Sequence, residues 1–147
     1  MNNRKDCRNM SNFKENLLEV LKIKEIDAKN FLEKLGLNKN YLYDTNEHST
    51  LLSSAINIAN NLQLSLDFLC DRNSLLETET KIRSADKFLP NLLSILKQLQ
   101  ISQRTFCRNL HLSTSCFTRW RNGYLPYLST IVEIADYLDC SIDDLLI

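Results

Sequence analysis

The stretch that decides the fold is SQRTFCRNLHLSTSCFTRWRNGYLP, residues 102–126. Ser102 and Ser113 each precede a short run with apolar residues at helical spacing, and the second run ends before Gly123. Ser favours the N-terminal cap of a helix, and Gly readily takes the left-handed conformation that ends one. The spacing therefore predicts two short helices joined by a tight turn, which is the helix-turn-helix arrangement.

The second of these predicted helices carries a polar and basic outward face. Its apolar residues Cys116, Phe117 and Trp120 are expected to point inward, which leaves hydroxyl and guanidinium side chains on the outside. The outward residues are Thr114, Ser115, Thr118, Arg119 and Arg121. Hydroxyl groups and Arg side chains read base edges, and Arg also pairs with phosphate. The pattern thus favours a recognition helix in the major groove of double-stranded DNA.

The chain contains an internal repeat. Residues 13–42 match residues 88–117 at an offset of 75, and after one added residue the match resumes at an offset of 76. The pairs at the first offset are Phe13/Phe88, Asn16/Asn91, Leu17/Leu92, Leu18/Leu93, Leu21/Leu96, Lys22/Lys97, Ile26/Ile101, Phe31/Phe106, Leu35/Leu110 and Leu37/Leu112. The pairs at the second offset are Ile58/Ile134, Ala59/Ala135, Leu62/Leu138, Ser65/Ser141, Asp67/Asp143 and Leu69/Leu145. Most are apolar residues at helical spacing, so the sequence predicts two tandem copies of one helical unit.

We predict an N-terminal tail at 1–12, a first copy at 13–70, a linker at 71–87 and a second copy at 88–147. Each copy is expected to form short helices in the same order. In the first copy we expect them near 13–23, 28–35, 39–45, 51–62 and 66–70. In the second copy we expect them near 89–99, 103–110, 113–121 and 129–138, with a last helix opened by a capping box at 141–144.

The composition agrees with an all-α fold. Apolar residues make up 44% of the chain, and only two Gly and two Pro interrupt it. The sequence lacks both the roughly 18 apolar residues of a membrane span and the apolar run of a signal peptide. We therefore expect no membrane association and a cytoplasmic protein, associated with the nucleoid when bound to DNA. The five cysteines are odd in number and form no C-x-x-C, so we expect reduced thiols.

The charges are unevenly distributed along the second copy. The formal net charge of the chain is zero, which by itself is unfavourable for a protein that binds phosphate. Between 89 and 127 every charged residue is positive, namely Lys97, Arg104, Arg108, Arg119 and Arg121. Between 130 and 147 every charged residue is negative, namely Glu133, Asp136, Asp139, Asp143 and Asp144. The second copy therefore has a basic half, which includes the predicted recognition helix, and an acidic half.

One cluster has the residue types of a metal site. Cys107 and His111 are one helical turn apart and Cys116 follows, but buried free Cys usually packs as a small hydrophobe and His111 is placed to end a helix. We therefore expect no metal and no cofactor. The chain also shows no paired carboxylates, Gly-rich phosphate loop or nucleophile beside a base at a meaningful spacing, so we expect no enzyme and no catalytic residues.

The second copy resembles the Cro/C1 (XRE) family of phage repressors. The resemblance rests on Gln103, on W-R-N-G at 120–123 and on A-x-x-L-x-x-S-x-x-x-L at 135–145. It implies a lambda-repressor-like domain of five helices that binds operator DNA, usually with two-fold symmetry. By position it implies that Gln103 contacts the DNA backbone, that Thr114, Ser115 and Arg119 face bases, and that Arg121, Asn122 and Tyr124 lie along phosphates.

Two residues depart from the family pattern. Cys107 stands where the family usually has Ala, and His111 where it usually has Gly. Cys is close to Ala in size, so the packing between the helices should be retained. A left-handed conformation at His111 is expected to cost about 1 kcal/mol.

The first copy keeps the apolar pattern but loses most of the predicted DNA-binding face. Gln103 is matched by Ala28, Arg119 by Asp44, Arg121 by Asn46 and Gly123 by His48, and Leu32 stands at the small-residue position. An acidic side chain near phosphate is repulsive. Lys39, Asn40 and Tyr43 are still available for DNA. The sequence favours a docking or dimerisation role for residues 13–70, because a fold can keep its packing while its site changes.

The predicted function is sequence-specific repression of transcription in a phage or mobile element, without catalysis. Either one chain grips two half-sites through its tandem copies, or two chains pair through a two-fold axis, and we favour a homodimer. The alternative is a protein-binding module that has borrowed the fold, such as an antirepressor, an antitoxin or a phage inhibitor of a host defence enzyme. That module would bind a protein partner through residues 13–70. In a hybrid of the two readings, the second copy would also repress the promoter of its own gene.

Overall fold

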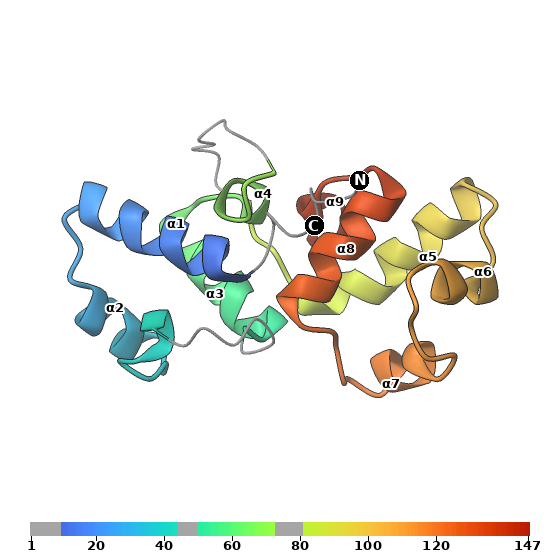
Figure 1. Cartoon of the computed structure of the whole chain (residues 1–147), viewed down its shortest axis with the longest axis horizontal. Helices are drawn as coiled ribbons and strands as arrows, with labels where there is room; N and C mark the ends of the chain where they lie inside the picture. Colours follow the sequence, from blue (N-terminus) through green and yellow to red (C-terminus); the bar gives the residue numbers. More distant parts are fainter. Residues whose placement is uncertain (1–9, 44–49, 73–80) are drawn as a thin grey trace.

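The computed structural model describes residues 10–43, 50–72 and 81–147, and within them it is helical (Figure 1). The first copy contains α1 (Met10–Ile23), α2 (Ala28–Lys34), the 3-10 turn η2 (Tyr41–Tyr43), α3 (Leu52–Leu62) and α4 (Leu66–Leu69). After the 3-10 turn η3 (Ala85–Lys87), the second copy contains α5 (Phe88–Gln98), α6 (Gln103–Asn109), α7 (Cys116–Arg121), α8 (Leu128–Leu138) and α9 (Ile142–Leu146). The all-α class is confirmed. In the described part of the chain, no helix has the length and apolar character to cross a bilayer.

Equivalent helices of the two copies begin with equivalent caps. The side chain of Asp27 accepts a hydrogen bond from the backbone at the start of α2, and Ser102 does the same for α6. Ser65 caps α4, and Ser141 caps α9 in the predicted capping box with Asp144. Each cap satisfies a backbone N–H group that the helix itself leaves without a partner. The caps therefore fix the starts of four helices at the offsets seen in the sequence.

The helix ends agree in the same way, through residues with left-handed backbone. Glu25 and Gln100, at φ 55° and 57°, follow the first helix of each copy, and Gln63 and Asp139, at 55° and 52°, end the fourth. Gly36 and His111, at 76° and 56°, follow the second. The predicted left-handed conformation of His111 is thus confirmed. The first copy has glycine, the residue suited to this conformation, where the second has histidine.

Two predicted elements of the first copy differ in the structure. The helix expected at 39–45 is only the 3-10 turn η2 within the described residues, and positions 44 and 45 lie outside them. Asn38 and Asn40 occupy the preceding turn, where the Asn38 side chain accepts a hydrogen bond from the Asn40 backbone, a local alternative to helical bonding. The predicted tail at 1–12 lies mostly outside the described residues, and α1 already begins at Met10.

Within each copy the first helix packs on the last, α1 on α4 and α5 on α9. Between the copies, α3 packs on α8 and α4 packs on α9. The buried apolar side chains of both copies join in one continuous core, with Phe13 and Phe88 fully buried at equivalent positions. In Figure 1 this places α2 and α6 at opposite ends of the molecule, with α3 and α8 in the middle and α7 along the lower edge.

We predict that substitutions at the equivalent left-handed positions 36 and 111 change the stability of the protein in opposite directions. His111→Gly should raise the free energy of unfolding by about 0.5–1 kcal/mol, because it relieves the left-handed strain. Gly36→Ala should lower it by about 1 kcal/mol, although a Cβ atom at Gly36 would meet nothing within 4 Å. Urea unfolding followed by circular dichroism measures both; a loss of stability in His111→Gly would contradict the strain at this position.

Candidate nucleic-acid interface

The turn between α6 and α7 is longer than the sequence suggested. The recognition helix was expected to begin after Ser113, but α7 begins at Cys116 with Ser115 as its N-terminal neighbour. The hydroxyl of Ser113 accepts a hydrogen bond from the backbone N–H of Ser115 and lies 2.8 Å from the Ser115 hydroxyl. Thr114 and Ser115 therefore lie in the turn that leads into the helix. The expectation was wrong because a serine that bonds to its own turn resembles a helix cap in sequence.

An aromatic cluster holds α7 against the rest of the second copy. Trp120 lies edge to face with Phe88 of α5, with ring centroids 5.2 Å apart, and with Phe117, at 5.0 Å. Phe117 makes the same type of contact with Phe106 of α6, at 5.8 Å. Edge-to-face pairs of this kind contribute about 0.5–1.5 kcal/mol beyond the burial of their area. The inward face of α7 is therefore fixed, as predicted, which also fixes the direction of its outward face.

Cys107 and Cys116 belong to this core. Their sulfur atoms are 3.4 Å apart and both residues are buried, while His111 is exposed. Burial, followed by the hydrogen bond with Cys107, raises the pKa of the Cys116 thiol to about 12. Among the described residues, no three His, Cys, Asp or Glu side chains lie close enough together to hold a metal ion. The two thiols fill the space between α6 and α7, where a small neutral side chain is needed.

All eight residues predicted to contact DNA are exposed. They are Gln103 at the start of α6, Thr114 and Ser115 in the turn, Thr118, Arg119 and Arg121 on α7, and Asn122 and Tyr124 just beyond it. The backbone N–H groups of Asn122 and Tyr124 donate to carbonyl groups of α7, which holds this segment on the end of the helix. Gly123, at φ 92°, allows the chain to turn there.

A hollow of about 390 Å³ lies beside the C-terminal end of α7. The structure brings Arg119 and Tyr124 together in its lining, along with Leu51 and Ser53 of the first copy. Sequence reasoning missed these first-copy residues, because nothing local indicates that the start of α3 reaches α7. The outward face of the recognition helix therefore continues onto the first copy.

Two acidic residues of the second copy pair with arginines of the segment between α4 and α5. The carboxylate of Asp136 on α8 accepts a hydrogen bond from Nε of Arg72 at 2.9 Å. The carboxylate of Asp143 on α9 accepts two from Arg83, at 2.6 and 3.0 Å. In Figure 1, α9 lies at the upper side of the molecule and α7 at the lower. The paired negative charges are thus directed away from α7, which leaves the outward face of α7 basic.

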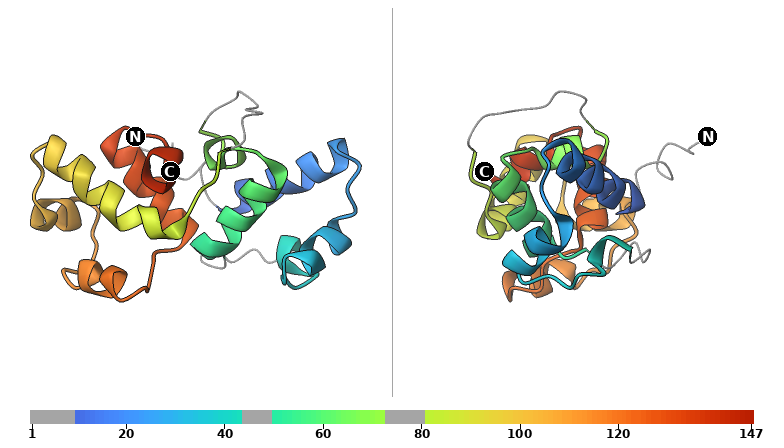
Figure 2. Two further views of the ribbon diagram at one scale, coloured as in Figure 1. Left: turned by 180° about the vertical axis from the view of Figure 1, so that it is seen from behind. Right: turned by 90° about the vertical axis from the view of Figure 1, so that its left-hand side faces the viewer.

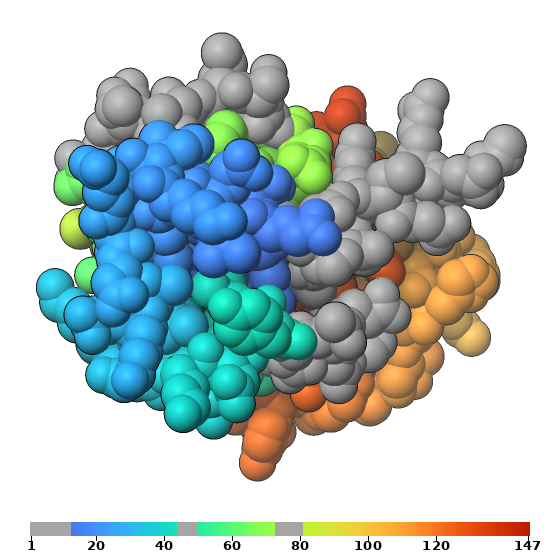
Figure 3. Space-filling model, turned by 60° about the vertical axis from the view of Figure 1, so that its left-hand side comes forward, coloured from blue at the N-terminus to red at the C-terminus, as the bar shows by residue number. Residues whose placement is uncertain are grey.

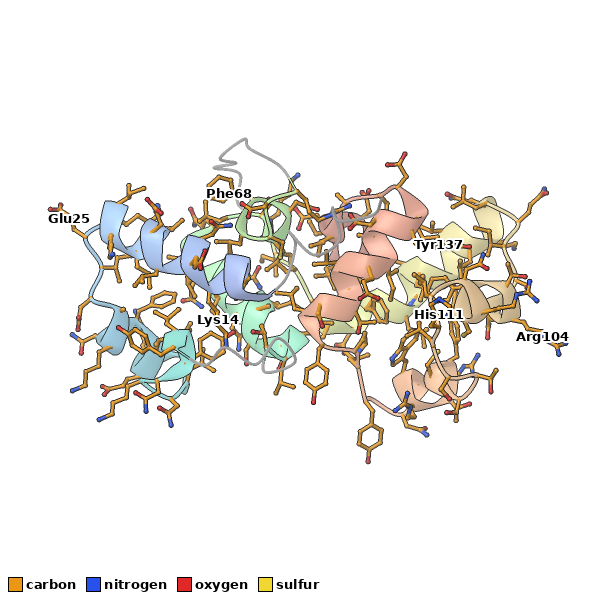
Figure 4. All side chains as sticks on the ribbon, in the orientation of Figure 1. Lys14, Glu25, Phe68, Arg104, His111 and Tyr137 are labelled. Atoms are coloured by element: carbon orange, nitrogen blue, oxygen red, sulfur yellow. The ribbon has the colours of Figure 1, made fainter. Side chains whose placement is uncertain are left out.

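The corresponding region of the first copy is built differently. Tyr41 of η2 donates a hydrogen bond to the hydroxyl of Thr50 at 3.2 Å, and the Lys14 ammonium lies 4.6 Å from the centre of its ring. Lys39, Asn40 and Tyr43 are exposed. Figure 4 shows the labelled Lys14 below α1 and directed towards this region, whereas Arg104 of α6 points away from the molecule at the far end of the second copy.

Comparison with known families bears on the second copy. Residues 91–147 match the family model of the Cro/C1-type HTH DNA-binding domain. The second copy is thus supported as a Cro/C1-type helix-turn-helix. The matched residues include α6, α7, α8 and α9 entire and most of α5. This supports a DNA-binding regulator of transcription. Comparisons with curated proteins and with solved structures returned no match.

We predict that the thiols of Cys107 and Cys116 resist alkylation in the folded protein. Both residues are buried, and below pH 9 the Cys116 thiol, with its pKa near 12, carries almost no thiolate, the reactive form. Between pH 9 and 12 the unfolded chain ionises first, so stability should fall as the pH rises. Iodoacetamide labelling at pH 8, with the modified peptides read by mass spectrometry, checks the first point. Rapid labelling of both peptides in the absence of denaturant would contradict it.

Proposed function

We propose that this protein is a sequence-specific transcription regulator, a repressor of phage or mobile-element type, that places α7 in the major groove of an operator in double-stranded DNA. The observation that carries the proposal is the exposed basic and hydroxyl-bearing face of α7 above a fixed aromatic core. A helix held in this way presents its side chains in one direction, which base recognition requires. The family match of residues 91–147 supports the same reading.

The proposed roles divide between base and phosphate contacts. Arg119 on α7 and Thr114 and Ser115 in the preceding turn face base edges, where guanidinium and hydroxyl groups discriminate between base pairs. Thr118 supplies a further hydroxyl on the exposed face. Gln103, Arg121, Asn122 and Tyr124 then lie along the DNA backbone, where they fix the position of α7 without reading sequence.

Neutral net charge is compatible with this role, because the paired acidic side chains lie elsewhere. Asp136 and Asp143 form ion pairs with Arg72 and Arg83, so their charges are balanced within the protein. A repressor of this kind acts in the cytoplasm, at the nucleoid, and requires neither a cofactor nor a metal for DNA binding. Specificity then depends on few contacts, because few cations are available to bind phosphate non-specifically.

The first copy serves as a docking module in this proposal. Its equivalent of α7 is the short turn η2, so it presents no full recognition helix within the described residues. The sequence favoured a homodimer, but the packing of α3 on α8 and of α4 on α9 supports the alternative in which the two copies of one chain pair with each other. A protein that binds residues 13–70 is the partner to be sought if DNA binding fails.

The test is selection of duplexes from a random DNA pool at ~0.15 M salt, where non-specific phosphate binding is weakened. The protein should enrich one motif. Arg119→Ala/Arg121→Ala should weaken binding to it by about 30-fold or more, because a base or phosphate contact contributes about 1–3 kcal/mol.

The matched control is Arg104→Ala/Arg108→Ala, which removes the same charge from the exposed surface of α6. It should change affinity much less. An equal loss in both double variants would mean non-specific attraction, and the absence of any enriched motif would redirect the search to a protein target of residues 13–70.

A further inference from the structure

Equivalent residues of the two copies meet each other at the contact between the copies. Leu51 and Tyr127, which differ by the offset of 76, form an isolated antiparallel bridge. At this bridge the backbone N–H of Leu128 donates to the carbonyl of Thr50 at 3.1 Å. Two of the helix contacts across the boundary also join equivalents, α3 with α8 and α4 with α9. Contact between equivalents is the property of an interface built around a two-fold axis.

The views of the molecule agree with such an axis. A half-turn about the vertical axis relates Figure 1 to the left view of Figure 2. After that turn α5 occupies the place that α1 had, with a similar slope, and α3 takes the place of α8. The axis is therefore close to vertical in Figure 1 and passes between α3 and α8. The chain has the symmetry of a two-fold dimer although it is one molecule.

Arg72 ties the two copies together at the upper end of this axis. Its guanidinium pairs with Asp67 of the first copy, with Asp136 at 2.9 Å and with the carbonyl of Cys140 at 2.8 Å. Asp67 also accepts hydrogen bonds from the backbone N–H of Ile142, at the start of α9. Burial alone would lower the pKa of Arg72, but the hydrogen bond that it donates to Asp136 and the charge of Asp67 raise it above its ordinary value. The cation is thus matched to a site formed by both copies.

Arg83 forms a second tie from the linker. Its backbone N–H and carbonyl both pair with the side chain of Asn60 on α3, at 3.1 and 3.0 Å, and its guanidinium pairs with Asp143 on α9. Asn60 and Asp136 are equivalent positions, as are Asp67 and Asp143. Polar residues at the same two equivalent positions therefore bind an arginine on each side of the axis. Arg83 is 3% exposed, so the surface it covers is closed to a second chain.

The symmetric arrangement presents both helix-turn-helix regions on one side of the molecule. In Figure 1, α7 and the region of α2 and η2 lie along the lower edge, at the end of the axis opposite to α4 and α9. In Figure 3 the atoms of residues near 40 and of the segment around α7 also reach the same lower edge. A two-fold pair that binds operator DNA presents its two recognition elements in this way. Among the residues that the structure describes, α7 is a helix with arginines on its exposed face, whereas the first copy has the turn η2.

We propose that the first copy takes the place of a second subunit, so that one chain is the complete DNA-binding unit and recognises a non-palindromic site. The statement about DNA rests on the proposed function. The statement that the two copies pair within one chain rests on the contacts between equivalent residues. The second copy has its pairing surface, on α8 and α9, covered by α3 and α4. Because Asp44 and Asn46 stand where the second copy has Arg119 and Arg121, base readout takes place on one side of the axis. On the other side, Lys39 and Tyr43 are exposed to contact backbone phosphates.

Cysteine cross-linking at the bridge distinguishes pairing within one chain from pairing between chains. Leu51 and Tyr127 occupy a non-hydrogen-bonded antiparallel pair, whose Cα atoms lie about 4.5 Å apart, within the range of a disulfide. Leu51→Cys/Tyr127→Cys should therefore form a disulfide within one chain and migrate as a monomer on a non-reducing gel. Sedimentation equilibrium should give the mass of one chain, 17.1 kDa.

The single variant Tyr127→Cys is the decisive control. If two chains paired through their second copies about an equivalent axis, position 127 would meet position 127 of the other chain and give a covalent dimer. That result would overturn the inference. We expect instead no more covalent dimer than in the unaltered chain, which controls for the protein's own five cysteines. Leu51→Cys alone tests pairing through the first copy in the same way.

The DNA part has a separate measurement. Native mass spectrometry with the enriched duplex should give one chain per duplex, and the enriched motif should lack two-fold symmetry. A palindromic motif that binds two chains would overturn the inference while leaving the proposed function intact. If no motif is enriched, the proposed function fails, and the cross-links still decide whether the copies pair within one chain.

Discussion

The carboxylate of Asp67 is 5% exposed, and both of its oxygen atoms accept hydrogen bonds from the backbone of Ile142, at 3.0 Å. A buried charge is costly unless it is paired and hydrogen-bonded. Asp67 obtains this compensation from two sources, Arg72 and the start of α9, and the second exists only when the copies are packed together. The interaction therefore favours one register of the two copies over others, since a shift would leave the charge without its partners. The direction in which α7 faces, relative to the first copy, follows from this register.

The same contact explains how a chain of zero net charge presents a basic surface. The acidic residues of the second copy gather on α8 and α9, and Asp136 and Asp143 there receive arginines from the segment between α4 and α5. Screening at physiological salt limits the interaction of exposed charges to about 8 Å, so balanced pairs on the far side have little effect at α7. The exposed face of α7 is therefore basic because the acidic residues lie on other helices, and not because the chain carries an excess of positive charge. Such a protein has little general attraction for DNA and depends on its few specific contacts.

Those parts of the fold that depend on local chemistry were predictable from the sequence. The caps Ser102 and Ser141 follow from residue types and spacing alone, and the left-handed position of His111 followed from the resemblance to a family that usually has Gly there. The inward aromatic face of α7 was also predictable, because helical spacing places Phe117 and Trp120 on one side. The start of α7 and the turn at Asn38 and Asn40 were not, because turn-forming serines and asparagines resemble helix caps.

The pairing of the copies depends on contacts between residues far apart in the chain, and sequence patterns carry little information about these. Arg72 and Asp136 are separated by 64 positions, and Arg83 and Asp143 by 60. In the sequence, Arg72 and Arg83 look like ordinary solvated charges of a polar linker. One trace of the contact was visible: Asp67 and Asp143 match at the second offset. A charged residue kept in both copies among apolar matches indicates a shared structural use.

Joining the two partners in one chain changes how a regulator of this kind responds to its own concentration. A dimer that assembles from separate subunits loses its DNA-binding form on dilution, because pairing depends on protein concentration. When the partner is part of the same chain, pairing depends instead on an effective concentration set by the linker, which for short flexible connections is about millimolar. In the proposed arrangement, occupancy of the operator below saturation then rises in simple proportion to the amount of protein. In the proposed arrangement the first copy needs only its pairing surface, which agrees with a core and caps that match the second copy while Asp44 and Asn46 replace Arg119 and Arg121.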